Sequence, residues 1–116
     1  MNEQILLSYG CEGGGSSVYK ITVNGEERIR QSSSFVDITE ECGDTYGTKE
    51  YSTFEAFWNE FVKNDYWVNF SPNFIHDDCK EIISKSVNNR YLKGLSFLAI
   101  HSIENWKLLL SKQNAG

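Results

Sequence analysis

The sequence has little of what marks several protein classes. It contains one proline and three cysteines, and no two cysteines form a Cys-x-x-Cys pair. An odd number of cysteines does not fit the disulfide frameworks of small secreted domains, and structural zinc sites normally use two close-spaced ligand pairs. No apolar run approaches the ~20 residues that a transmembrane helix requires. These absences argue against a disulfide scaffold, a structural zinc site and a membrane span.

An excess of basic residues is also missing. The chain has 16 acidic and 11 basic side chains, which gives a formal net charge of −5. Proteins that bind nucleic acid through its phosphates carry the opposite sign, so we expect no direct nucleic-acid binding. The negative charge is uneven along the chain. Residues 1–79 hold 14 Asp and Glu against 5 Lys and Arg, whereas residues 80–116 hold 2 against 6.

Aromatic residues, in contrast, are abundant. They make up 14% of the 116 residues, a content that excludes a disordered chain and predicts one folded domain over residues 1–116. The segment Met1-Asn2-Glu3-Gln4 has no basic region, and Ile5-Leu6-Leu7 is too short for the apolar part of a signal peptide. We therefore expect a cytoplasmic location.

The first half of the chain has the pattern of β-strands. Short apolar or alternating segments predict strands over residues 4–9, 18–23 and 26–34, with 35–38 as a further strand or the end of the third. Asn24-Gly25 is a strong hairpin signal, because a type I′ turn needs positive φ at both central positions. In the returning strand, Ile29 is expected to face the core, and Arg28 and Arg30 to face water. Residues 39–49 have no periodicity and predict a loop.

The second half changes to a helical period. Phe54, Phe57, Trp58, Phe61 and Val62 form one apolar stripe, and Ser52 with Glu55 matches a capping box. A second helix is predicted over residues 77–89, capped by Asp77 or Asp78, and a third from Ser102 to about residue 112. Residues 91–100 fit a strand or a helix, and 68–75, with Pro72, fit a connection. The sequence thus predicts an α+β fold, with an N-terminal antiparallel sheet of three to four strands against two to three C-terminal helices.

No catalytic motif is complete. Three glycines at positions 13–15 lead into a strand rather than a helix, so they match neither phosphate-binding fingerprint. A Cys-dependent enzyme would use Cys11 or Cys79 with His76 or His101 as its base, and the signatures around such a cysteine are absent. We expect no enzymatic activity, no metal and no cofactor.

An acidic segment that also carries tyrosines is the most informative feature. It predicts a surface that binds a basic protein, because opposed charges speed association and aromatic rings anchor interfaces. The expected binding residues are Asp37, Glu40, Glu41, Asp44, Tyr46 and Glu50, with Glu12, Asp77 and Asp78 as a second patch. A solvated loop that only aids solubility is the alternative for the segment, and a helix N-terminus is the alternative for Asp77 and Asp78.

Several short motifs resemble one protein family. They are Cys11-Glu12-Gly13-Gly14 after a strand, the helix with the Phe and Trp stripe, Trp67, and Pro72-x-Phe74-Ile75-His76 before a helix. Together they cover residues 4–23 and 52–87 and are similar to small bacterial immunity proteins encoded beside polymorphic or contact-dependent growth-inhibition toxins. The resemblance implies a cytosolic inhibitor that binds its cognate toxin domain, often a nuclease. It implies no catalytic residues and no fixed contact residues.

The sequence therefore predicts an immunity protein that neutralises a cognate toxin domain through an acidic surface. The main alternative is a small regulatory or adaptor module that binds a host protein and has no toxin partner. A Cys-dependent enzyme is a third alternative.

Overall fold

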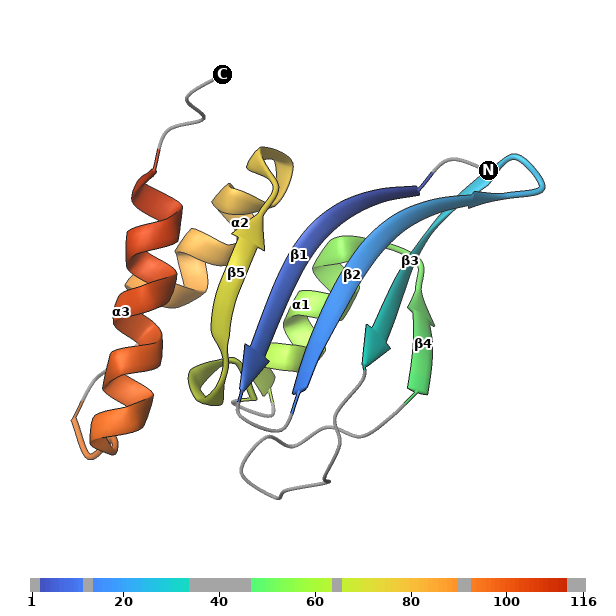
Figure 1. The fold of residues 1–116 in the computed structure, drawn as a ribbon. Helices are drawn as coiled ribbons and strands as arrows, with labels where there is room; N and C mark the ends of the chain where they lie inside the picture. Colours follow the sequence, from blue (N-terminus) through green and yellow to red (C-terminus); the bar gives the residue numbers. More distant parts are fainter. Residues whose placement is uncertain (1–2, 12–13, 34–46, 64–65, 90–92, 113–116) are drawn as a thin grey trace.

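The computed structural model describes residues 3–11, 14–33, 47–63, 66–89 and 93–112 (Figure 1). Within these residues a five-stranded antiparallel sheet has the strand order β4-β3-β2-β1-β5. The strands are β1 (Glu3–Cys11), β2 (Gly14–Val23), β3 (Glu26–Ser33), β4 (Gly47–Tyr51) and β5 (Ser71–Ile75). The helices are α1 (Phe54–Lys63), α2 (Asp77–Asn88) and α3 (Phe97–Ser111), with a short 3-10 helix η1 (Tyr66–Asn69). The α+β fold is confirmed, with one strand more than the three to four expected.

The helices are arranged around one face and one edge of the sheet. Figure 1 shows α1 behind the central strands, α2 behind β5, and α3 alongside β5 at the edge of the molecule. Contacts with β5, η1 and α2 hold α3 in this position. The opposite face of the sheet is not covered by any of the described helices.

The hairpin between β2 and β3 forms where the sequence predicts it. Asn24 has φ 53° and Gly25 has φ 81°, so both central residues adopt the positive φ that a type I′ turn requires. Val23 pairs with Glu26, and the register continues to Ser16 and Ser33. Ile29 is buried in the core, as expected from the alternation.

Two strands lie where the sequence predicts connections. β5 contains Pro72, which is tolerated because β5 is an edge strand and its pairing with β1 shifts register between Ser8 and Tyr9. A proline cannot donate a ladder hydrogen bond, so it suggested a connection over residues 68–75. β4 begins inside the expected loop over residues 39–49. The strand expected over residues 35–38 lies outside the described residues.

The first two helices begin with caps other than the expected ones. The amide of Ala56 donates to Thr53 Oγ1 at 3.1 Å, so Thr53 rather than Ser52 caps α1. Before α2, His76 has extended backbone angles and its Nδ1 accepts from the amide of Asp78 at 3.0 Å. Asp77 and Asp78 therefore occupy the first turn, where their charge suits the helix dipole, but neither is the cap.

The third helix starts earlier than expected. Ser96 caps it by accepting from the amide of Ala99 at 3.1 Å, and the helix continues to Ser111. Ser102, the expected cap, is buried inside the helix and donates to the carbonyl of Phe70. The undecided segment over residues 91–100 is therefore helical from Phe97 onward.

Aromatic rings form the centre of the core. Trp58, Trp67 and Trp106 lie within 5.5–6.3 Å of one another by ring centroid, and all three are buried. Phe61 extends this cluster to the sheet, where its ring lies 4.9 Å from that of Tyr9. Trp106 Nε1 also donates to the carbonyls of Phe70 at 2.8 Å and Trp67 at 3.1 Å. The same side chain thus fills the core and fixes α3 to η1 and the start of β5.

We expect Trp106→Phe to destabilise the fold by about 3 kcal/mol, because it shrinks a buried ring and removes a donor shared by two buried carbonyls. Trp58→Phe is the matched control, since its Nε1 makes a single bond to the part-buried hydroxyl of Ser86 at 2.9 Å. Urea unfolding should show a loss about 1 kcal/mol larger for W106F than for W58F. Equal losses would contradict a role for the Trp106 hydrogen bonds.

Candidate functional site

The strand register sorts the side chains of the outer strands onto two faces. Paired residues of an antiparallel sheet lie on the same face, so Tyr51 lies with Ile29 on the core side. Lys49 is on this side too, and its Nζ contacts Glu60 of α1 at 2.5 Å. This contact raises the pKa of Lys49 and lowers that of Glu60. Glu50 lies between Lys49 and Tyr51 in β4, so its side chain is on the opposite, uncovered face.

Glu50 lies on the uncovered face between two arginines. Its carboxylate is 3.1 Å from Arg28 Nε and 3.1 Å from Arg30 Nη2. The prediction that Arg28 and Arg30 face away from the core is confirmed. Because two positive charges surround one carboxylate, Glu50 is compensated and this part of the face has no acidic excess. Glu50, one of the expected binding residues, therefore lies on the uncovered face in an ion-pair cluster with two arginines.

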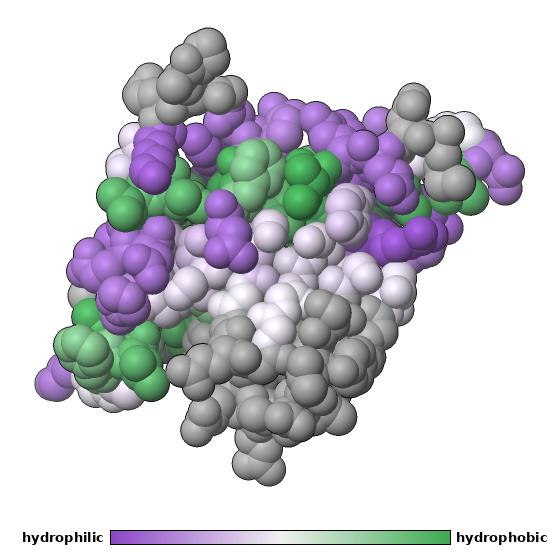
Figure 2. All heavy atoms as spheres, in the orientation of Figure 1, coloured by the Kyte–Doolittle hydropathy of each residue, from purple (hydrophilic) through white to green (hydrophobic). Residues whose placement is uncertain are grey.

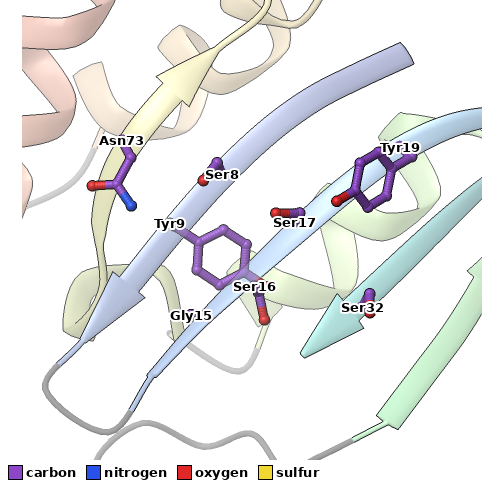
Figure 3. Close-up of a pocket in the computed structure, with 8 residues that line it drawn as sticks. All are labelled: Ser8, Tyr9, Gly15, Ser16, Ser17, Tyr19, Ser32 and Asn73. Atoms are coloured by element: carbon purple, nitrogen blue, oxygen red, sulfur yellow. The ribbon is translucent and has the colours of Figure 1, made fainter. Parts of the chain in front are cut away.

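A shallow hollow opens on the same face (Figure 3). It has a volume of about 280 Å³ and is lined by Ser8, Tyr9, Gly15, Ser16, Ser17, Tyr19, Ser32 and Asn73. Gly10 and Gly15 pair directly here, and a Cβ at Gly10 would approach the carbonyl oxygen of Gly14 to 2.9 Å. The close backbones and small side chains leave the space open. Hydroxyls and an amide line it, so it suits a hydrogen-bonding group of a partner.

One end of the sheet carries the attachment points of the acidic segments. β1 ends at Cys11 and β2 begins at Gly14, directly beside each other in the register. At the same end, Ser33 pairs with Gly47, and Ser16 pairs with Ser33. Residues 12–13 link β1 to β2, and residues 34–46 link β3 to β4. The four strand ends that flank these two segments thus lie together. Of the expected site residues, Glu12, Asp37, Glu40, Glu41, Asp44 and Tyr46 lie outside the described residues.

Asp77 and Asp78 lie further along the sheet, away from these strand ends. β5 runs from Ser71, beside Gly10, to Ile75, beside Leu7, and α2 follows. Asp77 contacts Lys80 Nζ at 3.0 Å, whereas the Asp78 side chain is 74% exposed. The register separates this pair from the strand ends that flank residues 12–13.

Two of the candidate catalytic residues, Cys79 and His76, have structural roles. Cys79 is buried in the core, and burial raises the pKa of its thiol to about 12. His76 uses Nδ1 for the α2 cap, and its Nε2 lies 2.9 Å from the side-chain amide of Gln4. Among the described residues, no group of three or more His, Cys, Asp or Glu is placed to hold a metal ion. These positions weigh against Cys79 as a nucleophile.

No protein-family model, curated protein or solved structure matches the chain. Among its described helices, none has the length and apolar character needed to cross a membrane.

We expect the Cys79 thiol to be unreactive in the folded protein. A pKa raised from 9.0 to about 12 lowers the thiolate fraction near neutral pH by about a thousandfold, and the thiolate is the nucleophile. In a C11S/C42S variant, iodoacetamide should modify Cys79 slowly when folded and at the rate of a free thiol in denaturant. The folded-state rate should rise with pH up to about 12. Fast modification of the folded variant at neutral pH would restore Cys79 as a nucleophile candidate.

Proposed function

We propose that this protein is an immunity protein that binds and neutralises a toxin domain in the cytoplasm. The observation that carries the proposal is the placement of the strand ends. Residues 34–46 contain four carboxylates and no Lys or Arg, and residue 12 adds a fifth. The strands that flank both segments end at one end of the sheet. Acidic side chains attached there suit the basic substrate cleft of a nuclease.

The uncovered face beside this end supports the proposal. The hollow reaches Gly15, Ser16 and Ser32, close to the paired ends of β2, β3 and β4. Tyr19 lines the hollow with its ring, and an accessible tyrosine is a frequent anchor in protein interfaces. A basic partner docked at the acidic end would place hydrogen-bonding side chains over the hollow. The proposed surface therefore combines long-range attraction with a site for close contact.

The proposal is tested by co-expressing this protein with the C-terminal domain of the protein whose gene lies directly upstream. An immunity protein allows growth of cells that produce the toxin domain and co-purifies with it as a stable complex. Cell death, or survival without a complex, would overturn the proposal and favour the adaptor alternative, in which the partner is a host protein without toxicity.

Reversing the charge of Glu40 and Glu41 together should mainly slow association with the toxin domain. We expect about a tenfold lower association rate at low salt and a smaller effect at physiological salt, because ions screen the attraction. Surface-based kinetics at two salt concentrations would measure both effects.

E26K/E27K is the matched control for this variant. It makes the same change in net charge, but Glu26 and Glu27 are exposed at the β2–β3 hairpin, the opposite end of the sheet. Its association rate should change much less. Equal slowing by both double variants would show a dependence on net charge alone and would contradict docking at the acidic end.

Replacing Tyr19 with alanine should weaken the complex by about tenfold or more, chiefly by faster dissociation. Val23→Ala is the control, since Val23 is exposed at the far end of β2, remote from the hollow. It should leave the affinity within about twofold of the parent. Unchanged affinity in Y19A would exclude the hollow from the interface.

A further inference from the structure

Helix α3 carries an apolar surface that the fold does not use. Its inner side is buried through Ala99, Ser102, Ile103 and Trp106. On its outer side, Phe97 is 81% exposed, Leu98 76% and Leu108 58%. Exposed apolar side chains gathered on one surface commonly mark an interaction site. No other element of the described chain covers this outer side (Figure 1).

The outer side has a regular spacing. Phe97, His101, Glu104 and Leu108 are all exposed and follow each other at intervals of four, three and four residues. This is the a/d spacing by which two helices form a left-handed coiled-coil contact. From Phe97 to Leu108 there are 11 rises of 1.5 Å, so the four residues extend over about 16 Å of helix. Figure 2 shows hydrophobic side chains at both ends of α3 and hydrophilic ones between them.

The pattern is also palindromic, and this feature identifies the partner. In an antiparallel pair related by a two-fold axis between positions 102 and 103, Phe97 faces Leu108 of the second copy. In the same pair, His101 faces Glu104 of the second copy. Each apolar end thus meets an apolar end, and each histidine meets a carboxylate. A two-fold interface requires such self-complementarity, because the same patch is used twice.

A parallel pair does not have this complementarity. It would place His101 against His101 and Glu104 against Glu104, and it would leave like groups in contact. A polar pair at the centre of a helix contact commonly fixes its register and orientation. We propose that the protein forms an antiparallel homodimer through the outer side of α3. An interface of one helix per copy is small, so the dimer is expected at roughly 100 µM protein rather than at nanomolar concentration.

Sedimentation equilibrium over about a hundredfold range of protein concentration tests the proposal. The unmodified chain should show a monomer–dimer equilibrium, and Leu108→Glu should make it monomeric by placing a charge in both apolar layers. V23E is the control, because it adds the same charge at an exposed apolar position far from α3. A monomer at every concentration, or a dimer that persists in L108E, would overturn the proposal.

Charge variants test the antiparallel register itself. H101E places carboxylates opposite each other, and E104K places two basic groups opposite each other, so each variant alone should raise the dimer Kd by about tenfold. A mixture of the two should form a heterodimer with the original affinity. In it, the introduced glutamate at position 101 faces the introduced lysine at position 104.

Circular dichroism of each variant verifies that it is folded, which Leu108, His101 and Glu104 permit because they are exposed. Failure of the mixture to recover dimerisation would overturn the antiparallel register. If the unmodified chain forms no dimer and L108E loses toxin binding, the outer side of α3 binds the toxin and the dimer proposal is overturned. The proposed dimer does not depend on the proposed function. Helix α3 packs beside β5, at one edge of the sheet, whereas the acidic segment is attached to β3 and β4, near the other edge.

Discussion

The carbonyl of Phe70 and the rings around it join the two halves of the molecule. Ser102 and Trp106 both donate to this carbonyl from α3, and Phe70 itself is fully buried against Tyr9 of β1, with ring centroids 4.8 Å apart. A buried carbonyl needs a partner, and here two donors come from a helix more than 30 residues away. This contact holds α3 against the short segment that leads into β5. The position of β5, and hence the shape of one sheet edge, depends on it.

The sequence predicts the elements whose signal is local. The stripe from Phe54 to Phe61 becomes the buried side of α1 because its spacing matches one helix face. Asn24-Gly25 becomes a hairpin because few other dipeptides adopt two positive φ angles. Caps are less predictable, since Ser52 and Thr53, or His76, Asp77 and Asp78, are adjacent residues of similar capacity. Which of them caps depends on where the preceding chain enters the helix.

Features that depend on strand pairing could not be predicted from the sequence. β5 has no alternation and contains Pro72, and only its place beside β1 makes it a strand. The compensation of Glu50 by Arg28 and Arg30 requires that β4 pairs with β3, which lies 13 residues earlier in the chain. The hollow depends on the register that places Ser8, Ser17 and Ser32 side by side. In each case the responsible residues are visible in the sequence, but their contact is a property of the register.

The acidic segment and the C-terminal lysines lie in different parts of the molecule. The basic residues of the C-terminal part include Lys80, Lys85, Lys107 and Lys112, which lie on α2, on α3 or directly after α3. The acidic segment, residues 34–46, is attached to the ends of β3 and β4, whereas α3 packs beside β5 at the opposite edge of the sheet (Figure 1). Asp77, Asp78 and Glu81 on α2 and Glu104 on α3 offset these lysines, so attraction of a basic toxin domain would depend on the acidic segment. The outer side of α3 would then remain free for a second copy, so one molecule has room for both partners at once.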